Sequence, residues 1–241
     1  MTQRKIKKFY KDVSVGEREG GFAVLLDGKP LKTPSHSAYA LPSRALAEVL
    51  AEEWRGQGKT IDPAAMPLTR LVNTAVERVP VNRAPVAEQV LAVGKSDLLC
   101  YRAEAPQELA ARQADAWDPL LDWLAGRHGV RLVVGQGIAF VQQPAEALMA
   151  LEQAVWHLDD FSLAGLSAAA LILGSLVLAL ALAEGRLCAA EAFRLATLDE
   201  TFQAERWGED AEAKARLTRL TADLAAVERF LRLVHPKPAG A

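Results

Sequence analysis

Carboxylates crowd around one tryptophan in the segment LDETFQAERWGEDAEA, residues 198–213. Clustered carboxylates can hold a metal ion, act as general acid and base in a hydrolase, or present negative charge to another protein. Trp207 stands among them, directly before Gly208, and bulky aromatic residues beside charges are frequent at protein interfaces. The acidic residues are Asp199, Glu200, Glu205, Glu209, Asp210 and Glu212. The residue types favour a binding surface, with a carboxylate-based or metal-dependent hydrolase of unknown substrate as the alternative.

The same segment also has a purely structural interpretation. Gly208 can end one helix, and Asp210 can cap the next. Glu212 and Arg216 are four residues apart and would form a favourable ion pair on one helix face. Acidic residues are common at helix starts because the helix dipole favours them there. The segment therefore predicts two helices separated at Gly208, whichever role the acids have.

Other motifs that suggest catalysis are incomplete. Gly94-Lys95-Ser96 is similar to the end of a phosphate-binding loop, but Gln89 stands where that loop needs a glycine. The four histidines are scattered, and none forms the Glu-x-x-His pair of a di-iron bundle. The chain has no Gly-x-Ser-x-Gly elbow, and neither cysteine comes with a defined base. We therefore expect no catalytic residue, no cofactor and no metal ion.

The composition is that of an ordinary globular protein. The 241 residues are 51% hydrophobic and 24% charged, with a formal net charge of −2. This length supports one large domain or two modest ones, and the near-neutral charge argues against a nucleic-acid partner. Cys100 and Cys188 lie in separate apolar runs, without the spacing of a disulfide framework or a zinc site. These features indicate a reducing compartment.

The N-terminal segment MTQRKIKKFYKD is basic, with no apolar stretch behind it. It therefore does not have the pattern of a secretory signal, and it lacks the serine-rich amphipathic character of a transit peptide. Its cations could form a nucleic-acid patch. Because the whole chain is nearly neutral, we favour a solvated strand edge with Ile6, Phe9 and Val13 packed inward.

An uncharged apolar run extends from Phe161 to Ala183. Its length of about 23 residues would suffice to cross a bilayer. Much of the run is Ala, Ser and Gly, however, and neither a basic cluster nor an aromatic belt flanks it. We therefore predict a buried core helix, with a membrane span as the alternative.

The remaining pattern separates a β-rich beginning from a helical remainder. Residues 22–26 precede Asp27-Gly28, the dipeptide typical of a tight hairpin turn, and residues 31–33 follow it. Ser43 can cap the next helix, which Gly56 can end. The predicted fold class is α+β. It consists of a small β-rich N-terminal domain with one helix, residues 1–62, and a larger mainly α-helical domain, residues 63–241, with a short hairpin near 130–141.

Four segments occur in the order and spacing of one family: MPLTRLVNTAVERV (66–79), DLLCYRA (97–103), RQADAWDPLLDW (112–123) and LDETFQAERWGEDAEA (198–213). Through them the chain resembles the assembly chaperones that bind the α subunit of the catalytic F(1) head of ATP synthase. The resemblance covers nearly the whole chain, from FYKDVSV to the last helix. It implies the two-part fold, no catalysis, and a chaperone that holds the free α subunit until the β subunit takes its place.

The resemblance also implies a site, a location and a set of partners. An acidic residue important in the family carries over to Glu212, and Ala211 leaves open which neighbouring carboxylate matters. A bacterial, cytoplasmic member is expected, with the mitochondrial matrix as the location of eukaryotic relatives. We expect a monomer that binds the α subunit, without nucleic acid or membrane insertion. The expected partner-binding residues are Glu212, Asp210, Glu209, Trp207, Gly208, Asp199, Glu200 and Gln203.

Overall fold

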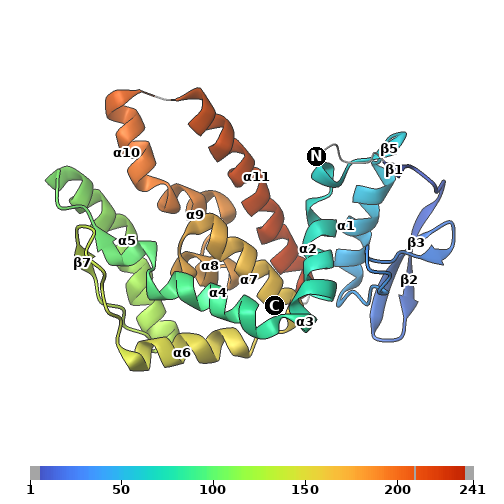
Figure 1. The fold of residues 1–241 in the computed structure, drawn as a ribbon, viewed down its shortest axis with the longest axis horizontal. Coiled ribbons are helices and arrows are strands. Elements are labelled where there is room, and N and C mark those ends of the chain that lie inside the picture. Colours follow the sequence, from blue (N-terminus) through green and yellow to red (C-terminus); the bar gives the residue numbers. More distant parts are fainter. Residues whose placement is uncertain (1–5, 209, 237–241) are drawn as a thin grey trace. The chain divides into compact units, whose positions relative to one another are not determined.

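The computed structural model describes residues 6–208 and 210–236 (Figure 1). Short strands near the N-terminus and a larger helical part confirm the α+β class. By its internal contacts the chain divides into two compact units, and residues 63–83 group with the N-terminal strands. Unit 1 is Met1–Arg83, Asp160–Gly165 and Arg229–Ala241, and unit 2 is Ala84–Asp159 and Leu166–Glu228.

An antiparallel sheet of three strands forms the β part of unit 1. Its strands are β2 (Val13–Arg18), β3 (Gly21–Leu26) and β4 (Lys29–Pro30). Asp27 and Gly28 join β3 to β4 with φ of 48° and 77°, the left-handed conformation that a tight two-residue hairpin turn requires. This confirms the predicted turn, although the strand after it is shorter and begins earlier than predicted.

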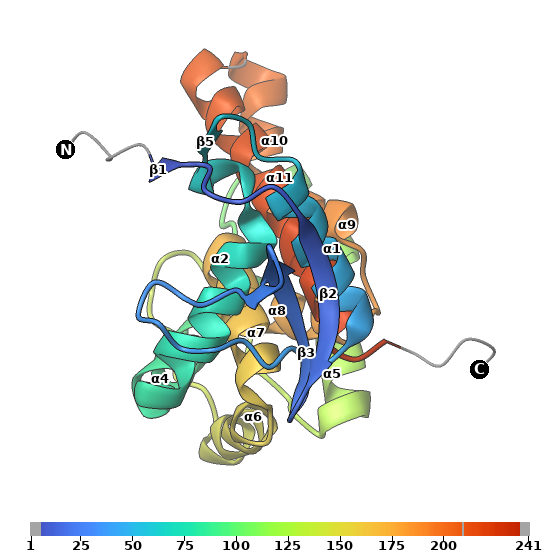
Figure 2. The same ribbon diagram turned by 90° about the vertical axis from the view of Figure 1, so that its right-hand side faces the viewer.

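Helix α1 (Arg44–Arg55) packs against β2 and β3 (Figure 2). The Ser43 hydroxyl accepts a hydrogen bond from the Leu46 backbone N–H at 3.0 Å, which confirms the predicted cap. Apolar residues recur on one face of α1 and are buried: Leu46, Ala47, Leu50, Ala51 and Trp54.

The segment after α1 continues unit 1 with a short strand and short helices. Glu53 of α1 caps α2: its carboxylate accepts bonds from the backbone N–H of Leu68 and of Thr69, both at 2.8 Å. A capping residue can therefore come from another helix, because Met66 at the N-cap position makes no side-chain bond. The elements are β5 (Thr60–Ile61), η1 (Pro63–Ala65), α2 (Pro67–Asn73), the π-helical turn η2 (Thr74–Arg78) and α3 (Val79–Val81).

The prediction for the N-terminal segment is wrong for two of its three apolar residues. Ile6, in β1 (Ile6–Lys7), is 54% exposed and Phe9 is 67% exposed, whereas Val13 is buried. Strand β1 ends at Lys7 and Val13 begins a separate strand, β2, so the segment is not one continuous strand with a single inward face. Tyr10 is the buried neighbour instead, and its hydroxyl donates to the Trp54 carbonyl at 2.7 Å.

Helices make up nearly all of unit 2. Helix α8 is its most completely buried segment, because every residue from Leu176 to Leu182 is buried. A Cβ on Gly94 would lie 2.8 Å from Leu176 Cδ2, so glycine at this position lets α4 approach α8 closely. The elements from α4 onward, of which α4, α7 and α11 each have one end in unit 1, are α4 (Arg83–Lys95), η3 (Leu98–Cys100), β6 (Tyr101–Arg102), α5 (Gln107–His128), β7 (Gly135–Gln136), α6 (Ala145–Trp156), α7 (Asp160–Leu173), α8 (Leu176–Ala183), α9 (Ala189–Ala196), α10 (Leu198–Trp207) and α11 (Ala211–Val234).

Residues 130–141 do not form the predicted hairpin. The strand in this segment, β7, pairs in parallel with β6, so that Tyr101 lies opposite Gly135. The side-chain amide of Gln143 bonds to both the N–H and the carbonyl of Val133, at 2.8 and 3.0 Å. A side chain thereby satisfies the backbone groups that a second hairpin strand would have paired.

The long apolar run forms two helices rather than the single predicted one. Helix α7 ends at Leu173, Gly174 has φ of 62°, and the Ser175 hydroxyl caps α8 by accepting from the Leu178 N–H at 3.0 Å. Many side chains of the run from Phe161 to Ala183 are buried in the protein, as predicted for a core segment. Within residues 6–208 and 210–236, we find no helix with the length and apolar character needed to cross a membrane.

A buried carboxylate stabilises the break in this run. Asp97 is fully buried and accepts hydrogen bonds from the Ser175 hydroxyl at 2.7 Å and from the backbone N–H of Val177 and Leu99, each at 3.0 Å. Burial raises the pKa of Asp97 to about 6, and hydrogen bonds, first that from Val177, act against this rise. The folded chain therefore binds a proton on Asp97 more tightly than the unfolded chain does.

This pKa gives a pH-dependent prediction for Asp97→Asn. Because the pKa of Asp97 is higher in the folded than in the unfolded chain, its protonation contributes full stability below about pH 4. This contribution is lost as the pH rises through about 6. We expect the stability advantage of the unchanged protein over Asp97→Asn to shrink by on the order of 2 kcal/mol between pH 4.5 and 7.5. Urea unfolding at a series of pH values measures this advantage. The exposed Asp122→Asn on α5 is the control, with a difference independent of pH; a constant or growing gap for Asp97→Asn would contradict the prediction.

Candidate functional site

The acidic segment lies on two consecutive helices of unit 2, α10 and the first part of α11, between which the chain reverses direction (Figure 1). Gly208 ends α10 with φ of 92°, a conformation that side-chain-bearing residues rarely adopt. The Asp210 carboxylate accepts from the Ala213 N–H at 2.8 Å and so caps α11. Both predicted helix boundaries are confirmed, and Glu209 lies outside the described residues.

Phe202 anchors α10 through a cluster of charges. Its ring is buried, with the Arg112 and Arg206 guanidinium groups 5.0 and 4.3 Å from the ring centroid. Arg112 of α5 also pairs with Glu205 at 2.7 Å and with Glu108 at 2.9 Å, while Arg206 bonds to Glu108. The bond to Glu205 is the main cause that raises the pKa of Arg112. Glu205 is thus paired within the protein.

Asp199 is engaged by a buried amide. Its Oδ1 atom accepts a hydrogen bond from Gln113 Nε2 at 2.8 Å. The Gln113 side-chain carbonyl oxygen in turn accepts a hydrogen bond from the Ala103 backbone N–H at 2.8 Å. Because Gln113 is buried, losing either partner would leave a polar group unsatisfied. Asp199 therefore fixes the start of α10 against α5.

Glu200, rather than Glu212, is the carboxylate that pairs with Arg216. Both of its oxygens accept from Arg216 Nη2, at 2.9 and 2.7 Å. This ion pair links α10 to α11, so the predicted pair between Glu212 and Arg216 within α11 is wrong. The prediction failed because spacing along one helix identifies local partners only, and a carboxylate on the neighbouring helix lies within reach.

The side chains that remain exposed define a smaller surface. Trp207 is 77% exposed, and Gln203 and Glu212 are exposed as well. Within the part of the chain that the structure describes, none of these three side chains makes a hydrogen bond or an ion pair. From Ala211 to Asp223, moreover, no residue of α11 is buried. We call this surface the acidic tip: Gln203, Trp207, Gly208, Asp210 and Glu212.

The described carboxylates of the cluster do not meet at a metal site or in the cavity next to α10. Among the described residues, no group of three or more His, Cys, Asp or Glu side chains could hold a metal ion. A cavity of about 630 Å³ adjoins α10. Of the described acidic residues of the cluster, Glu205 alone is in its lining, together with its partner Arg112. A hydrolase would need at least two of these acids in one pocket. The acidic tip can instead offer an indole and negative charge to another protein.

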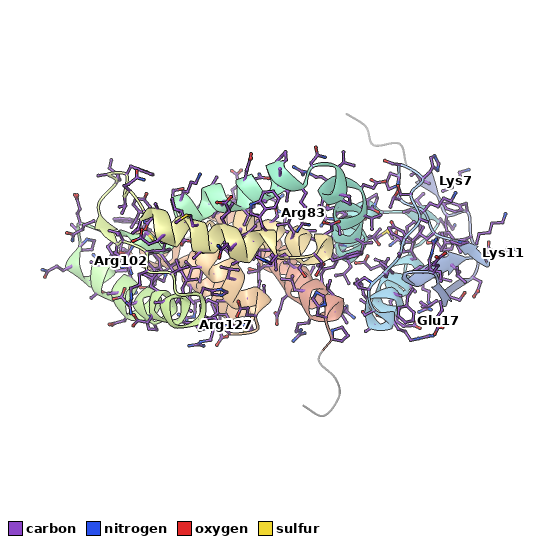
Figure 3. The ribbon with its side chains drawn as sticks, turned by 90° about the horizontal axis from the view of Figure 1, so that it is seen from below. Lys7, Lys11, Glu17, Arg83, Arg102 and Arg127 are labelled. Atoms are coloured by element: carbon purple, nitrogen blue, oxygen red, sulfur yellow. The ribbon has the colours of Figure 1, made fainter. Side chains whose placement is uncertain are left out.

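Residues of the motifs DLLCYRA and RQADAWDPLLDW make structural contacts in this protein. Arg102, labelled in Figure 3, pairs with Asp118 at 2.6 Å and lies 5.0 Å from the Trp117 ring centroid. Trp117 in turn donates its indole N–H to the Leu195 carbonyl at 3.0 Å. The sequence analysis did not identify Arg112, the cation that pairs with Glu205 of the acidic cluster. Its signal was the arginine of the motif RQADAW.

Comparison with known proteins decides the family. Residues 7–125 match the family model described as ATP12 chaperone protein. The crystal structure of Atp12 from Paracoccus denitrificans is 43% identical, covers 95% of this chain and 99% of its own, and superposes with a TM-score of 0.92. The chain belongs to the ATP12 chaperone family.

Two further relatives extend the similarity. The crystal structure of the Atu1473 protein from Agrobacterium tumefaciens is 44% identical over 94% of this chain and 85% of its own, with a TM-score of 0.90. The mitochondrial protein atp12 of Schizosaccharomyces pombe is 25% identical over 98% of this chain and 87% of its own. The chain is thus a bacterial ATP12-family chaperone of ATP synthase assembly, as the sequence motifs predicted.

The two aromatic residues of α10 provide a test of the division between anchored and exposed side chains. We expect Phe202→Ala to lower the free energy of unfolding by about 3 kcal/mol, since it removes a buried ring. Trp207→Ala should change it by less than about 0.5 kcal/mol, because the indole is mostly exposed. Urea unfolding followed by far-ultraviolet circular dichroism measures both values. Equal losses for the two variants would show that the tip is packed rather than exposed.

Proposed function

We propose that this ATP12-family chain binds the free α subunit of the ATP synthase F(1) sector and shields its interface until the β subunit replaces the chaperone. The observation that carries the proposal is the exposed Trp207 at the end of α10, together with the exposed Glu212 at the start of α11, where no residue from Ala211 to Asp223 is buried. An exposed indole makes a large contact at low entropic cost, and tryptophan is enriched among residues that dominate binding energy.

The physical need for such a protein comes from the client. An unassembled subunit exposes a large interface, which associates wrongly if it stays uncovered. The cover must later come off, so a polar contact steered by charge suits the task better than a large apolar one. The acidic tip has this character, because its one large apolar group stands among polar ones.

The expected site residues divide into two roles under this proposal. Trp207, Gln203 and Glu212 contact the α subunit, and Gly208 lets the chain turn between them. Asp210, Asp199 and Glu200 hold the two helices in place through the bonds described above. This assignment requires no catalysis, cofactor or metal ion, and places a monomeric chaperone in the bacterial cytoplasm.

Reversing the charge at the tip should weaken capture of the client. In co-expression with the α subunit of the host, we expect Glu212→Lys and Trp207→Ala each to lower the amount of α recovered with the tagged chaperone at least tenfold, a loss of about 1.4 kcal/mol. Glu152→Lys makes the same charge change at an exposed position of α6 and should leave capture unchanged. Added β subunit should release α from the unchanged chaperone.

Two outcomes would contradict this proposal in different ways. If the unchanged chaperone recovers no α subunit, the client is wrong. If it recovers α, and both tip variants do so equally well with unchanged melting temperatures, the surface is wrong.

A further inference from the structure

A second candidate binding site lies within unit 1. It is a cleft of about 750 Å³, a size typical of ligand sites, to which the N-terminal segment, the β-hairpin, the end of α1 and the start of α2 all contribute. We call it the N-terminal cleft. Its apolar lining includes Ile6, Phe9, Leu26, Leu31, Ile61 and Met66.

The mouth of this cleft is unusually apolar for a surface. Phe9 is 67% exposed and Ile6 is 54% exposed, and both belong to the lining. Large apolar side chains that gather at the surface beside a cleft mark sites of interaction. Neither side chain is buried by the described part of unit 1.

One hydrogen-bond donor in the lining is left without an acceptor. Trp54 is buried, with 9% of its surface exposed, and its indole Nε1–H has no hydrogen-bond partner among the described residues. The ring is held in place by Tyr10, whose ring centroid lies 5.6 Å away. The nitrogen atom itself is closed off from solvent, so Trp54 contributes its ring to the lining rather than an open hydrogen-bond site.

The charged groups around the cleft favour a negatively charged occupant. Lys29 and Lys32 line it. Asp27 also lines it, but accepts bonds from the backbone N–H of Asp12 and Lys11, at 2.8 and 3.0 Å, which hold its pKa below the ordinary value. Asp27 therefore keeps its negative charge, and the three cationic side chains of the lining, Lys29, Lys32 and Arg70, outnumber it.

Two further lysines add positive charge near the mouth. Lys7 and Lys11 lie two residues to either side of Phe9 along the chain, and both are exposed at the surface of unit 1 (Figure 3). Opposite charge on a binding partner would be attracted to this surface and would raise the rate of encounter.

We propose that the N-terminal cleft binds an extended apolar segment of a client polypeptide that is flanked by acidic side chains. The apolar side chains of the segment cover Phe9 and Ile6 and fill the cleft that the Trp54 ring lines, and its acidic flanks pair with the lysines. The inference rests on the proposed chaperone function and adds to it a second contact, of opposite charge to the acidic tip.

The test follows the indole N–H of Trp54 by nuclear magnetic resonance in the full-length chain with ¹⁵N-labelled tryptophan. The signal is assigned by its loss in Trp54→Phe. The probe is a capped peptide of sequence EELVFLVEE, with KKLVFLVKK and EESTNSTEE as matched controls for charge and apolarity. We expect EELVFLVEE to shift the Trp54 signal in a saturable manner, and each control to bind at least tenfold more weakly.

Variants of exposed residues identify the surface without disturbing the fold. We expect Phe9→Ser and Lys32→Glu each to weaken binding of EELVFLVEE at least fivefold. Val81→Ser removes an exposed apolar side chain of unit 1 that does not line the cleft, and Lys95→Glu makes the same charge reversal at an exposed position of α4. Neither should have an effect. Unchanged far-ultraviolet circular dichroism shows that the variants are folded.

The outcomes separate this inference from the proposed function. If EELVFLVEE leaves the Trp54 signal unmoved, binds no better than KKLVFLVKK, or is surpassed by dodecanoate as a free apolar carboxylate, the inference is overturned. Glu212→Lys should bind the peptide with unchanged affinity, since it lies at the acidic tip. Peptide binding without capture of the α subunit would reject the proposed client and keep the cleft, whereas capture without peptide binding would reject the cleft alone.

Discussion

The helical unit depends on one buried carboxylate. Asp97 lies between two segments far apart in the sequence and accepts hydrogen bonds from both, so it fixes the place where the apolar run breaks at Ser175. The break allows α8 to start in a new direction with its first backbone donors satisfied. Helices α5 and α9 pack on α8, and α10 follows α9 along the chain, so the position of the acidic tip is built outward from this contact. Three donors offset part of the cost of desolvation, and the remainder raises the pKa of Asp97 to about 6.

Local chemistry explains which parts of the fold were predictable from sequence. The turn at Asp27-Gly28, the cap at Ser43 and the helix end at Gly208 each follow from a conformation or a hydrogen bond available within a few residues. The break at Gly174 was not predicted, because small residues in an apolar run are equally typical of a tightly packed continuous helix. It needed Asp97, a partner that lies 78 residues from Ser175 in the chain.

The candidate site shows the same limit at the level of charge. The sequence located the acidic cluster, but it could not divide the acids into those that the protein uses and those that it leaves exposed. That division depends on arginines of other helices: Arg112 takes Glu205, and Arg216 takes Glu200. Glu212, the carboxylate that the family resemblance indicates, is different: its side chain is exposed and has no partner among the described residues. A cluster of like charges in a sequence therefore overstates the charge that a partner meets.

A holder that must later release its client gains from two modest contacts rather than one strong contact. When two surfaces of one chain bind the same partner, the second contact forms within the complex, and the joint affinity exceeds either alone. An incoming subunit that displaces one contact removes this advantage at once, so release does not need to overcome the whole binding energy in one step. The acidic tip and the basic N-terminal cleft, each with one exposed aromatic residue, would also reject a partner that offers the same charge at both places, because like charges brought together cost several kcal/mol. Opposite charges on two separate surfaces thus give selectivity for one client without the large apolar interface that would make its release slow.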